Sequence, residues 1–228
     1  MAIADLTTAT LPARQRRKEA RPQELLEAGL ALFVEKGFAA TRADEIATRA
    51  GVSKGTLYLY YPSKEELLKA VIRERLGLEI AAGADAARHF TGSASDLLRE
   101  LFTGWWMNVF DSPASGVFKL IITEVRNFPD IAEFYRREVI EPGQRLIGSV
   151  LQRGIDSGEF RSDFDVTLAV QSLVLPMVMT CLHKHSLGAC QPIETLMKPL
   201  PFFRQHIELV LRGVRANAAA PARRKGAR

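Results

Sequence analysis

The sequence predicts an all-α fold, and three observations support this prediction. Over long stretches, apolar residues recur every three to four positions, which is the period of a helix with one buried face. Ser, Thr and Asp residues stand at positions where such helices begin, and Gly and Pro residues stand where they end. No stretch of useful length alternates apolar and polar residues as a half-buried strand would. With 228 residues, of which 47% are hydrophobic and 25% charged, the chain can bury a sizeable globular core.

The N-terminal residues 1–21 are poor in aromatic residues and contain several arginines. We expect them to form a flexible basic arm that is solvated or, alternatively, enters a DNA minor groove. Pro22 suits the first turn of a helix. Leu25, Ala28 and Leu32 then continue a helical apolar face as far as Gly37.

The stretch from Thr41 to Lys64 predicts two short helices and the start of a third. Thr41 and Asp44 have the spacing of a capping box, and Gly51 stands where a helix commonly ends in the left-handed conformation. Ser53 is a second N-cap candidate for a helix over 54–60, which Pro62 would end before a third start at Ser63. A helix, a turn containing glycine and a second helix form a helix-turn-helix arrangement.

The second of these helices has a composition that suits DNA contact. Leu57 can anchor it in a core while Lys54, Thr56, Tyr58 and Tyr60 offer a cation, hydroxyls and flat rings outward. Gly55 leaves room for the close approach of a phosphate or base edge. The alternative is an ordinary helical hairpin with exposed tyrosines.

The ordered runs FAATRADEIA (38–47), AGVSKGTLY (50–58) and YYPSKEEL (60–67) resemble the N-terminal signature of the TetR/AcrR family of transcriptional regulators. The resemblance covers roughly residues 22–68, with Arg21 at a position where relatives often have a Thr or Ser cap. It implies a DNA-binding regulator, most often a repressor, whose base-edge contacts are Lys54, Gly55 and Thr56. The full set of implied DNA-contacting residues is Thr41, Arg42, Ser53, Lys54, Gly55, Thr56, Tyr58, Tyr60 and Lys64.

Helical patterns continue through the remaining two-thirds of the chain. We expect helices over 63–87 with a possible break near Gly83, from Ser95 as a cap to Val109, and over 117–128, 131–140, 144–155, 166–184 and 194–214. Pro142 would end one helix, Asp165 would cap another and Pro176 would kink it. The expected domains are a basic arm (1–21), a helix-turn-helix domain (22–68), a helical ligand-binding and dimerisation domain (69–215) and a basic tail (216–228).

An aromatic cluster in the central helices indicates either a ligand cavity or a packed core. Trp105 and Trp106 are adjacent and cannot face the same way, so one of them needs a cleft or a polar partner for its N–H. The expected effector is a small hydrophobic or aromatic molecule, cationic if Glu124 faces inward. The candidate ligand-binding residues are Trp105, Trp106, Phe110, Phe118, Glu124, Phe128 and Met177.

The two C-terminal helices carry more apolar residues than one internal face needs. Since one reading helix covers only a DNA half-site, we expect these helices to form the interface of a homodimer on a double-stranded operator. The alternative is that their apolar stripes belong to the core of one chain. The residues concerned are Leu168, Leu173, Leu175, Val178, Met179, Leu182, Phe202, Phe203, Ile207, Val210 and Leu211.

Other classes of function find little support in the sequence. Catalytic motifs and phosphate-binding glycine loops are missing, so no enzyme activity and no cofactor are expected. His183 and His185 lie two apart and fall on different sides of a helix, which disfavours a shared metal. The apolar run 173–182 is about half of the ~20 residues that a membrane span needs, and no targeting signal is convincing. We therefore expect a cytoplasmic protein that does not enter a membrane, with Cys181 and Cys190 as thiols.

Two further functions stay open at the level of sequence. One is a helical enzyme or carrier that binds a small molecule and resembles the DNA-binding motif only incidentally. The other is an architectural DNA-binding protein without an effector. Net charge +5 and a pI of about 9.4 permit nucleic-acid binding in each DNA-binding case.

Overall fold

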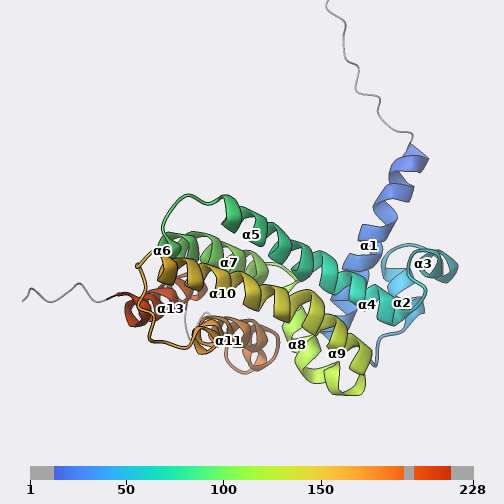
Figure 1. Cartoon of the computed structure of the whole chain (residues 1–228). Coiled ribbons are helices and arrows are strands. Elements are labelled where there is room, and N and C mark those ends of the chain that lie inside the picture. Colours follow the sequence, from blue (N-terminus) through green and yellow to red (C-terminus); the bar gives the residue numbers. More distant parts are fainter. Residues whose placement is uncertain (1–12, 193–197, 217–228) are drawn as a thin grey trace, which may run out of the picture. The chain divides into compact units, whose positions relative to one another are not determined.

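The computed structural model describes residues 13–192 and 198–216, and within these ranges every regular element is a helix (Figure 1). One isolated antiparallel bridge joins Phe160 to Arg215. The expected all-α fold is therefore confirmed. The chain divides into two compact units, Met1–Ala70 and Val71–Arg228.

The first unit contains α1 (Ala13–Lys36), α2 (Ala43–Arg49), α3 (Lys54–Tyr60) and most of α4 (Lys64–Ile72). The expected arm therefore overlaps α1, which begins before Pro22 rather than at it. The residues upstream of Pro22 are mostly Arg, Lys, Gln, Glu and Ala, all good helix formers, and α1 contains Pro22 in its interior at the loss of one backbone hydrogen bond. Residues 1–12 lie outside the described part of the chain.

Glycines and caps define the ends of these short helices. Gly37 and Gly51 have φ values of 85° and 64°, as expected for residues that follow a helix. Ser53 caps α3, because its Oγ accepts a hydrogen bond from the Thr56 backbone N–H at 3.1 Å. The Glu66 backbone N–H likewise donates to Ser63 Oγ at 3.1 Å.

The predicted capping box at Thr41 is wrong by one residue. α2 begins at Ala43, and the Glu45 carboxylate accepts from the backbone N–H of Arg42 at 3.0 Å. Thr41 is 2% exposed, and its hydroxyl donates instead to the carbonyls of Gly37 at 2.7 Å and Leu32 at 3.3 Å. The threonine therefore closes the turn after α1.

The core of the first unit joins all four helices. It consists of side chains with 0% exposure: Leu25, Phe33, Phe38, Ile46, Leu57 and Leu67. The Phe33 and Phe38 rings lie 5.3 Å apart, and the Tyr61 hydroxyl donates to the carbonyl of Pro22. Burial of these residues fixes the position of α3.

The second unit contains the remaining helices. They are η1 (Arg73–Gly77), α5 (Leu78–His89), α6 (Ala94–Leu97), η2 (Leu98–Phe102), α7 (Thr103–Asp111), α8 (Ser115–Glu124), η3 (Val125–Asn127), α9 (Pro129–Tyr135), η4 (Arg136–Ile140), α10 (Glu141–Asp156), α11 (Val166–His185), η5 (Leu187–Ala189) and α13 (Pro199–Val214). η1, η2 and η4 are single π-helical turns, and η3 and η5 are 3-10 turns.

Several predicted boundaries in this unit differ from the structure. Of the two alternatives for 63–87, the structure has the one without a break at Gly83, because α5 continues through this residue. Pro142 occupies the first turn of α10, directly after η4, where a missing N–H is tolerated. Ser93 rather than Ser95 caps α6, through a bond from the Asp96 backbone N–H.

Further boundaries concern the two C-terminal helices. Asp165 caps α11 as predicted, since its Oδ1 accepts from two backbone N–H groups. Pro176 lies within α11 and does not end it. Pro199 begins α13, and residues 193–197 of the expected last helix lie outside the described residues.

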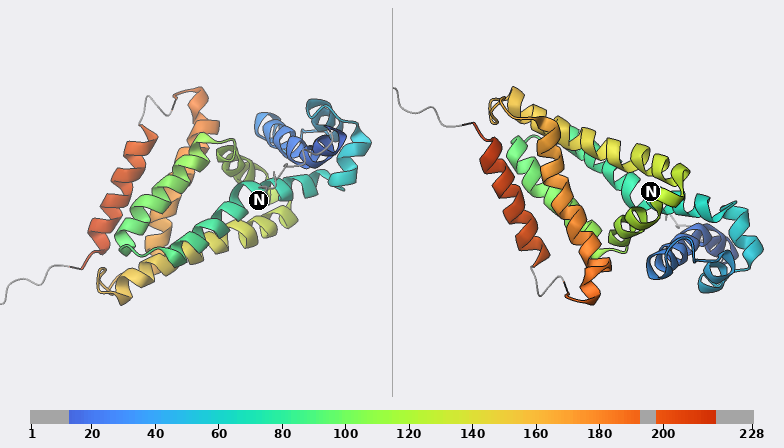
Figure 2. Two further views of the ribbon diagram at one scale, coloured as in Figure 1. Left: turned by 90° about the horizontal axis from the view of Figure 1, so that it is seen from above. Right: turned by 90° about the horizontal axis from the view of Figure 1, so that it is seen from below.

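Within the second unit, α5 and α10 lie side by side, and α11 packs against α8 and α13 (Figure 2). The connector between α10 and α11 folds back on α10, where the Phe160 backbone N–H donates to the Gly154 carbonyl. A Cβ on Gly154 would lie 2.1 Å from the Phe160 ring, so this packing requires glycine. α5, α7, α10 and α11 thereby surround an apolar interior.

Candidate nucleic-acid interface and ligand cavity

Helix α3 exposes one face and buries the other. Leu57 is 0% exposed and anchors the helix, whereas Lys54, Gly55, Tyr58 and Leu59 are exposed. Lys54 Nζ lies 5.9 Å from the centroid of the Tyr58 ring. The exposed face therefore combines a cation, an aromatic ring and an accessible backbone.

Gly55 leaves open space at the start of α3. A Cβ there would meet only Ser53 Oγ, at 3.8 Å. The backbone conformation is ordinary for a helix, so the local fold does not need glycine at this position. The open space suits close approach of a base edge or phosphate.

Thr41 and Lys64 point inward, unlike the exposed residues of α3. The Lys64 ammonium group donates to the carbonyls of Phe38 at 2.7 Å and Thr41 at 3.0 Å, and it lies 4.4 Å from the Phe38 ring centroid. Together with the buried Thr41 hydroxyl, it ties α4 to the turn before α2. We therefore remove these two side chains from the proposed DNA-contacting set and keep Arg42, Ser53, Lys54, Gly55, Thr56, Tyr58 and Tyr60.

Leu59 was not among the predicted site residues, although 76% of it is exposed on α3. The available signal was its position between Tyr58 and Tyr60, two residues away from the buried Leu57. An exposed leucine on this face is suited to an apolar contact with a thymine methyl group.

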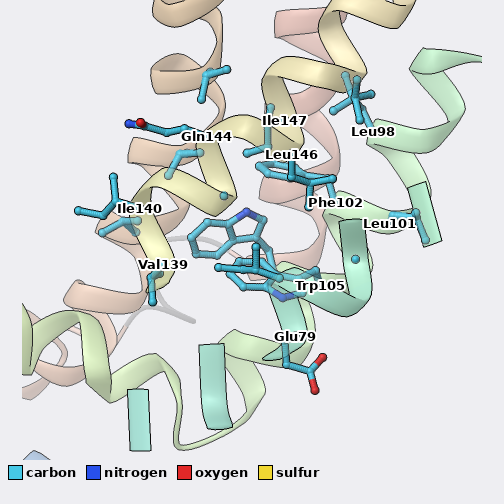
Figure 3. Close-up of a pocket in the computed structure, with 18 of the residues that line it drawn as sticks. Glu79, Leu98, Leu101, Phe102, Trp105, Val139, Ile140, Gln144, Leu146 and Ile147 are labelled. Carbon is cyan, nitrogen blue, oxygen red and sulfur yellow. The ribbon is translucent and has the colours of Figure 1, made fainter. Parts of the chain in front are cut away.

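The second unit contains a partly open cavity of about 310 Å³ whose walls are almost entirely apolar (Figure 3). Trp105, Trp106 and Phe118 line it, as predicted. Glu79, Gln144 and Gln171 contribute the polar groups of the lining. The other lining residues are Ile80, Gly83, Ala87, Leu97, Leu98, Leu101, Phe102, Tyr135, Val139, Ile140, Gly143, Leu146, Ile147, Val150, Val170, Val174, Leu175 and Val178.

The two tryptophans meet edge to face, with ring centroids 4.8 Å apart. Trp106 also stacks on Phe118 at 5.7 Å. The indole nitrogens of Trp105 and Trp106 are buried without a hydrogen-bond partner. A bound molecule with an acceptor oxygen would satisfy such a donor.

Tyr135 adds a hydroxyl to the cavity wall. Burial raises the pKa of this phenol well above its ordinary range, and the nearby Cys181 thiol acts in the same direction. The phenol is therefore neutral at physiological pH. Burial also raises the pKa of Cys181 to about 12, so this thiol stays protonated.

Four predicted ligand-binding residues do not line this cavity. Phe110 packs on Phe203, with ring centroids 6.1 Å apart, and Lys184 lies over its ring. Glu124 ends α8, Phe128 lies between η3 and α9, and Met177 is fully buried on α11. These four predictions were based on the presence of each residue in an aromatic or apolar helix. That presence does not determine where the side chain points. The largest groups of lining residues that were missed lie on α5, α10 and α11.

The described residues contain no group of three His, Cys, Asp or Glu side chains that could hold a metal ion. His183 Nε2 lies 2.8 Å from the carbonyl of Gln191, and His185 Nε2 lies 2.8 Å from Ser115 Oγ. The two histidines therefore have separate partners on different elements.

Helix α11 is long and apolar enough to cross a membrane by length and composition, but a third of its most apolar window is buried in the second unit. Among the described residues it is the one helix that meets these criteria. Its exposed apolar residues include Leu168, Leu175 and Met179. These exposed apolar residues are taken up under the proposed function.

A helix-turn-helix unit with an exposed reading helix, joined to a helical unit with an apolar cavity, defines a DNA-binding transcriptional regulator. The chain belongs to the TetR family of these regulators. Residues 25–71 match the family described as "Bacterial regulatory proteins, tetR family", and residues 90–195 match "Tetracyclin repressor-like, C-terminal domain". It is a regulator and not an enzyme, which removes the enzyme alternative.

Curated relatives agree with this assignment. The HTH-type transcriptional regulator YfiR of Bacillus subtilis is 33% identical over 63% of this chain and 70% of its own length. The HTH-type transcriptional repressor KstR2 of Mycolicibacterium smegmatis is 30% identical over 65% and 71%. Regulation of transcription through DNA is consistent with the expected cytoplasmic location.

Solved structures show the same fold. The fatty acid degradation regulator FadR from Bacillus halodurans has a TM-score of 0.71 at 20% identity and covers 85% of this chain and 95% of its own. FadR from Bacillus subtilis, solved in complex with stearoyl-CoA, has a TM-score of 0.67 at 21% identity, with coverage of 84% and 98%. FadR from Thermus thermophilus was solved in complex with lauroyl-CoA.

Proposed function

We propose that this protein is a homodimeric repressor that leaves its operator when a hydrophobic effector occupies the cavity. The observation that carries the proposal is the apolar cavity of about 310 Å³ within the second unit. This volume lies at the lower end of the range of small-molecule sites, about 300–1,000 Å³. A packed core would close a space of this size, because unfilled apolar cavities cost stability.

The lining favours an apolar, chain-like effector over a cationic aromatic one. Glu124 does not reach the cavity, and Glu79 is the acidic residue of the lining. The partnerless indole N–H groups and the neutral Tyr135 phenol offer donors to a carbonyl or ester oxygen. Relatives of the same fold that were solved with stearoyl-CoA and lauroyl-CoA support this class.

A homodimer accounts for the exposed apolar stripe on the C-terminal helices. Leu168, Leu175 and Met179 follow one another at intervals of seven and four residues, which places them on one face of α11. Leu209 adds to the exposed apolar surface on the adjacent α13, and His206 of α13 contacts the carbonyl of Ser172. A two-fold interface would bury this surface and pair two reading helices for half-sites ~34 Å apart.

A continuous helical segment connects the cavity to the DNA-binding unit and offers a way for the effector to cause release from the operator. Residues 64–89 are helical throughout, and Glu79, Ile80, Gly83 and Ala87 of this stretch line the cavity. An effector that displaces α5 therefore acts on the segment that leads to α4. The effector must bind the form with low DNA affinity more tightly than the other form, and a tenfold to hundredfold release needs only about 1.4–2.8 kcal/mol of coupling.

The DNA part is tested by operator binding. The upstream region of the gene, or DNA selected from a random pool, serves as the operator in a mobility-shift assay. Lys54→Ala should weaken specific binding by about 1–3 kcal/mol if Lys54 contacts a base edge. Lys69→Ala on α4, which removes a comparable charge that pairs with Glu66, is the control and should leave affinity near wild type.

The effector part is tested by filling the cavity. Gly143 lines it, and a Cβ there would lie 3.9 Å from Ile80, so Gly143→Leu should fold and occupy cavity space. This variant should bind DNA but no longer respond to an effector. Gly104→Leu, at an exposed position on α7 with open space around it, is the matched control and should respond normally.

Compounds are screened by tryptophan fluorescence together with operator release. A compound that quenches Trp105 or Trp106 without changing DNA affinity argues against coupling. If no apolar compound binds the wild-type protein, the architectural alternative without an effector is favoured.

A further inference from the structure

An open groove with five arginines lies between α5 and α10. Its volume is about 760 Å³, and its lining includes Arg73, Arg88, Arg137, Arg145 and Arg153. Glu138 is the acidic residue of that lining. This composition contrasts with the apolar cavity on the other side of the same two helices.

The arginines are spread along the groove. α5 and α10 run in the same direction, because Arg73 pairs with Glu138 at one end and Arg153 donates to the carbonyls of Phe90 and Gly92 at the other. Arg145 and Arg153 lie on α10 and Arg137 lies on η4 directly before it, so Arg145 is eight residues from each of the other two. At 1.5 Å per residue, this spacing separates successive positive positions by ~12 Å.

The carboxylates that pair with the arginines of the groove do not balance their positive charge. Arg88 pairs with Asp85 at 2.6 Å, Arg73 and Arg137 share Glu138, and Arg145 lies 3.8 Å from Glu141. Three carboxylates therefore face five guanidinium groups. The Arg88 and Arg145 side chains are 68% and 69% exposed, so a ligand can reach them.

The groove and the cavity share part of their walls. Five residues line both spaces: Ile80, Ala87, Leu97, Leu146 and Val150. Figure 3 shows Leu146 and Ile147 of α10 among the side chains that line the cavity. Side chains from α5, α6 and α10 thus lie between the apolar cavity and the basic surface groove.

We propose that this groove binds the phosphorylated headgroup of the effector whose apolar chain lies in the cavity. The inference rests on the proposed function and specifies its ligand class: an acyl chain joined to a group with several phosphates. Guanidinium groups bind phosphate oxygens in bidentate geometry. Positive positions ~12 Å apart suit phosphates distributed along an extended group better than the single carboxylate of a free fatty acid.

The test compares three probes by calorimetry on the full chain: lauroyl-CoA, dodecanoic acid and CoA. Lauroyl-CoA should bind at least tenfold more tightly than dodecanoic acid, and this advantage should shrink as salt is raised. The variant Arg88→Gln/Arg145→Gln should lose tenfold or more of the affinity for lauroyl-CoA while its affinity for dodecanoic acid stays the same.

The control variant is Arg126→Gln/Arg204→Gln, which removes two exposed arginines of the second unit away from the groove. It should bind lauroyl-CoA like the wild type. Equal loss in both double variants would mean a general effect of charge and would overturn the proposed headgroup site. An unchanged affinity in the groove variant would overturn it as well.

The outcomes separate this inference from the proposed function. If dodecanoic acid binds and releases DNA while lauroyl-CoA does not bind, the groove proposal is wrong and the effector-released repressor stands. If none of the apolar compounds binds the cavity and releases DNA, both are wrong.

Discussion

Two polar residues of the helix-turn-helix motif stabilise the fold of the first unit instead of facing outward. Thr41 and Lys64 lie among residues that the motif associates with DNA, yet both bond to backbone carbonyls. A buried polar group is retained only when its hydrogen bonds are satisfied, so these contacts are structural.

Lys64→Met should therefore reduce stability. The ammonium group donates to carbonyls of Phe38 and Thr41, and hydrogen bonds to a charged group contribute about 1.5–3 kcal/mol. Urea unfolding of the wild type and the variant measures the loss. If stability is unchanged and only operator affinity falls, Lys64 contacts DNA directly, as the family resemblance first implied.

Gly55→Ala separates folding from DNA recognition at a single residue. The Cβ meets only Ser53 Oγ at 3.8 Å, and alanine favours the helix by up to about 1 kcal/mol, so the variant should be at least as stable. Operator affinity should nevertheless fall, because the methyl group occupies space that the DNA needs. Parallel thermal melts and mobility shifts check both parts, and a variant with normal affinity would exclude close DNA approach at Gly55.

At the scale of elements, α8 and α11 are joined by a partly buried polar pair. His185 Nε2 lies 2.8 Å from Ser115 Oγ, and Ser115 is fully buried. Burial lowers the pKa of His185 below 6.5, and the charges of Lys184 and Lys119 add to this effect. The folded protein therefore resists protonation of this ring more than the unfolded chain does.

This difference predicts a stability that depends on pH. Above pH 6.5 the ring is mostly neutral in both states and the full stability is present. As the pH falls below 6.5, the unfolded chain binds the proton first, so stability is lost until the folded pKa is passed. Urea unfolding between pH 7.5 and 5.5 should show this loss, and it should be smaller in His185→Gln. An identical pH dependence in the variant would assign the effect to other groups.

At the scale of the whole molecule, the proposed dimer explains exposed apolar surface that one chain leaves uncovered. Met179 is 58% exposed on α11 and does not line the cavity. Met179→Glu should produce monomers, because two copies of the new carboxylate would be buried near each other at a two-fold interface. Analytical ultracentrifugation at micromolar concentration measures the mass.

Ile122→Glu on α8, where the side chain is 52% exposed, is the matched control and should stay dimeric. A wild-type species of 25.3 kDa under the same conditions would reject the dimer. Loss of the dimer in both variants would mean that the interface is not confined to the C-terminal helices.

The sequence predicts the helices and the first unit well because their signals are local. A residue that starts or ends a helix acts on the backbone of its own turn, so it can be recognised from neighbours a few residues away. Examples are Gly37, Gly51, Ser53 and Asp165. The boundaries expected at Pro22 and Pro142 were misplaced. α1 already begins at Ala13 and contains Pro22 in its interior, and Pro142 lies in the first turn of α10, where proline is tolerated.

By itself, therefore, the sequence determined an all-helical regulator with a reading helix anchored by Leu57, and it left open whether the aromatic cluster around Trp105, Trp106 and Phe118 is a cavity or a packed core. Only the tertiary structure decided which groups turn inward. Lys64 donates to carbonyls 23 and 26 residues away, and the cavity walls come from helices far apart in the chain. The physical reason is that helical spacing gives the relative phase of side chains on one helix, whereas the direction each face takes depends on the helices packed against it.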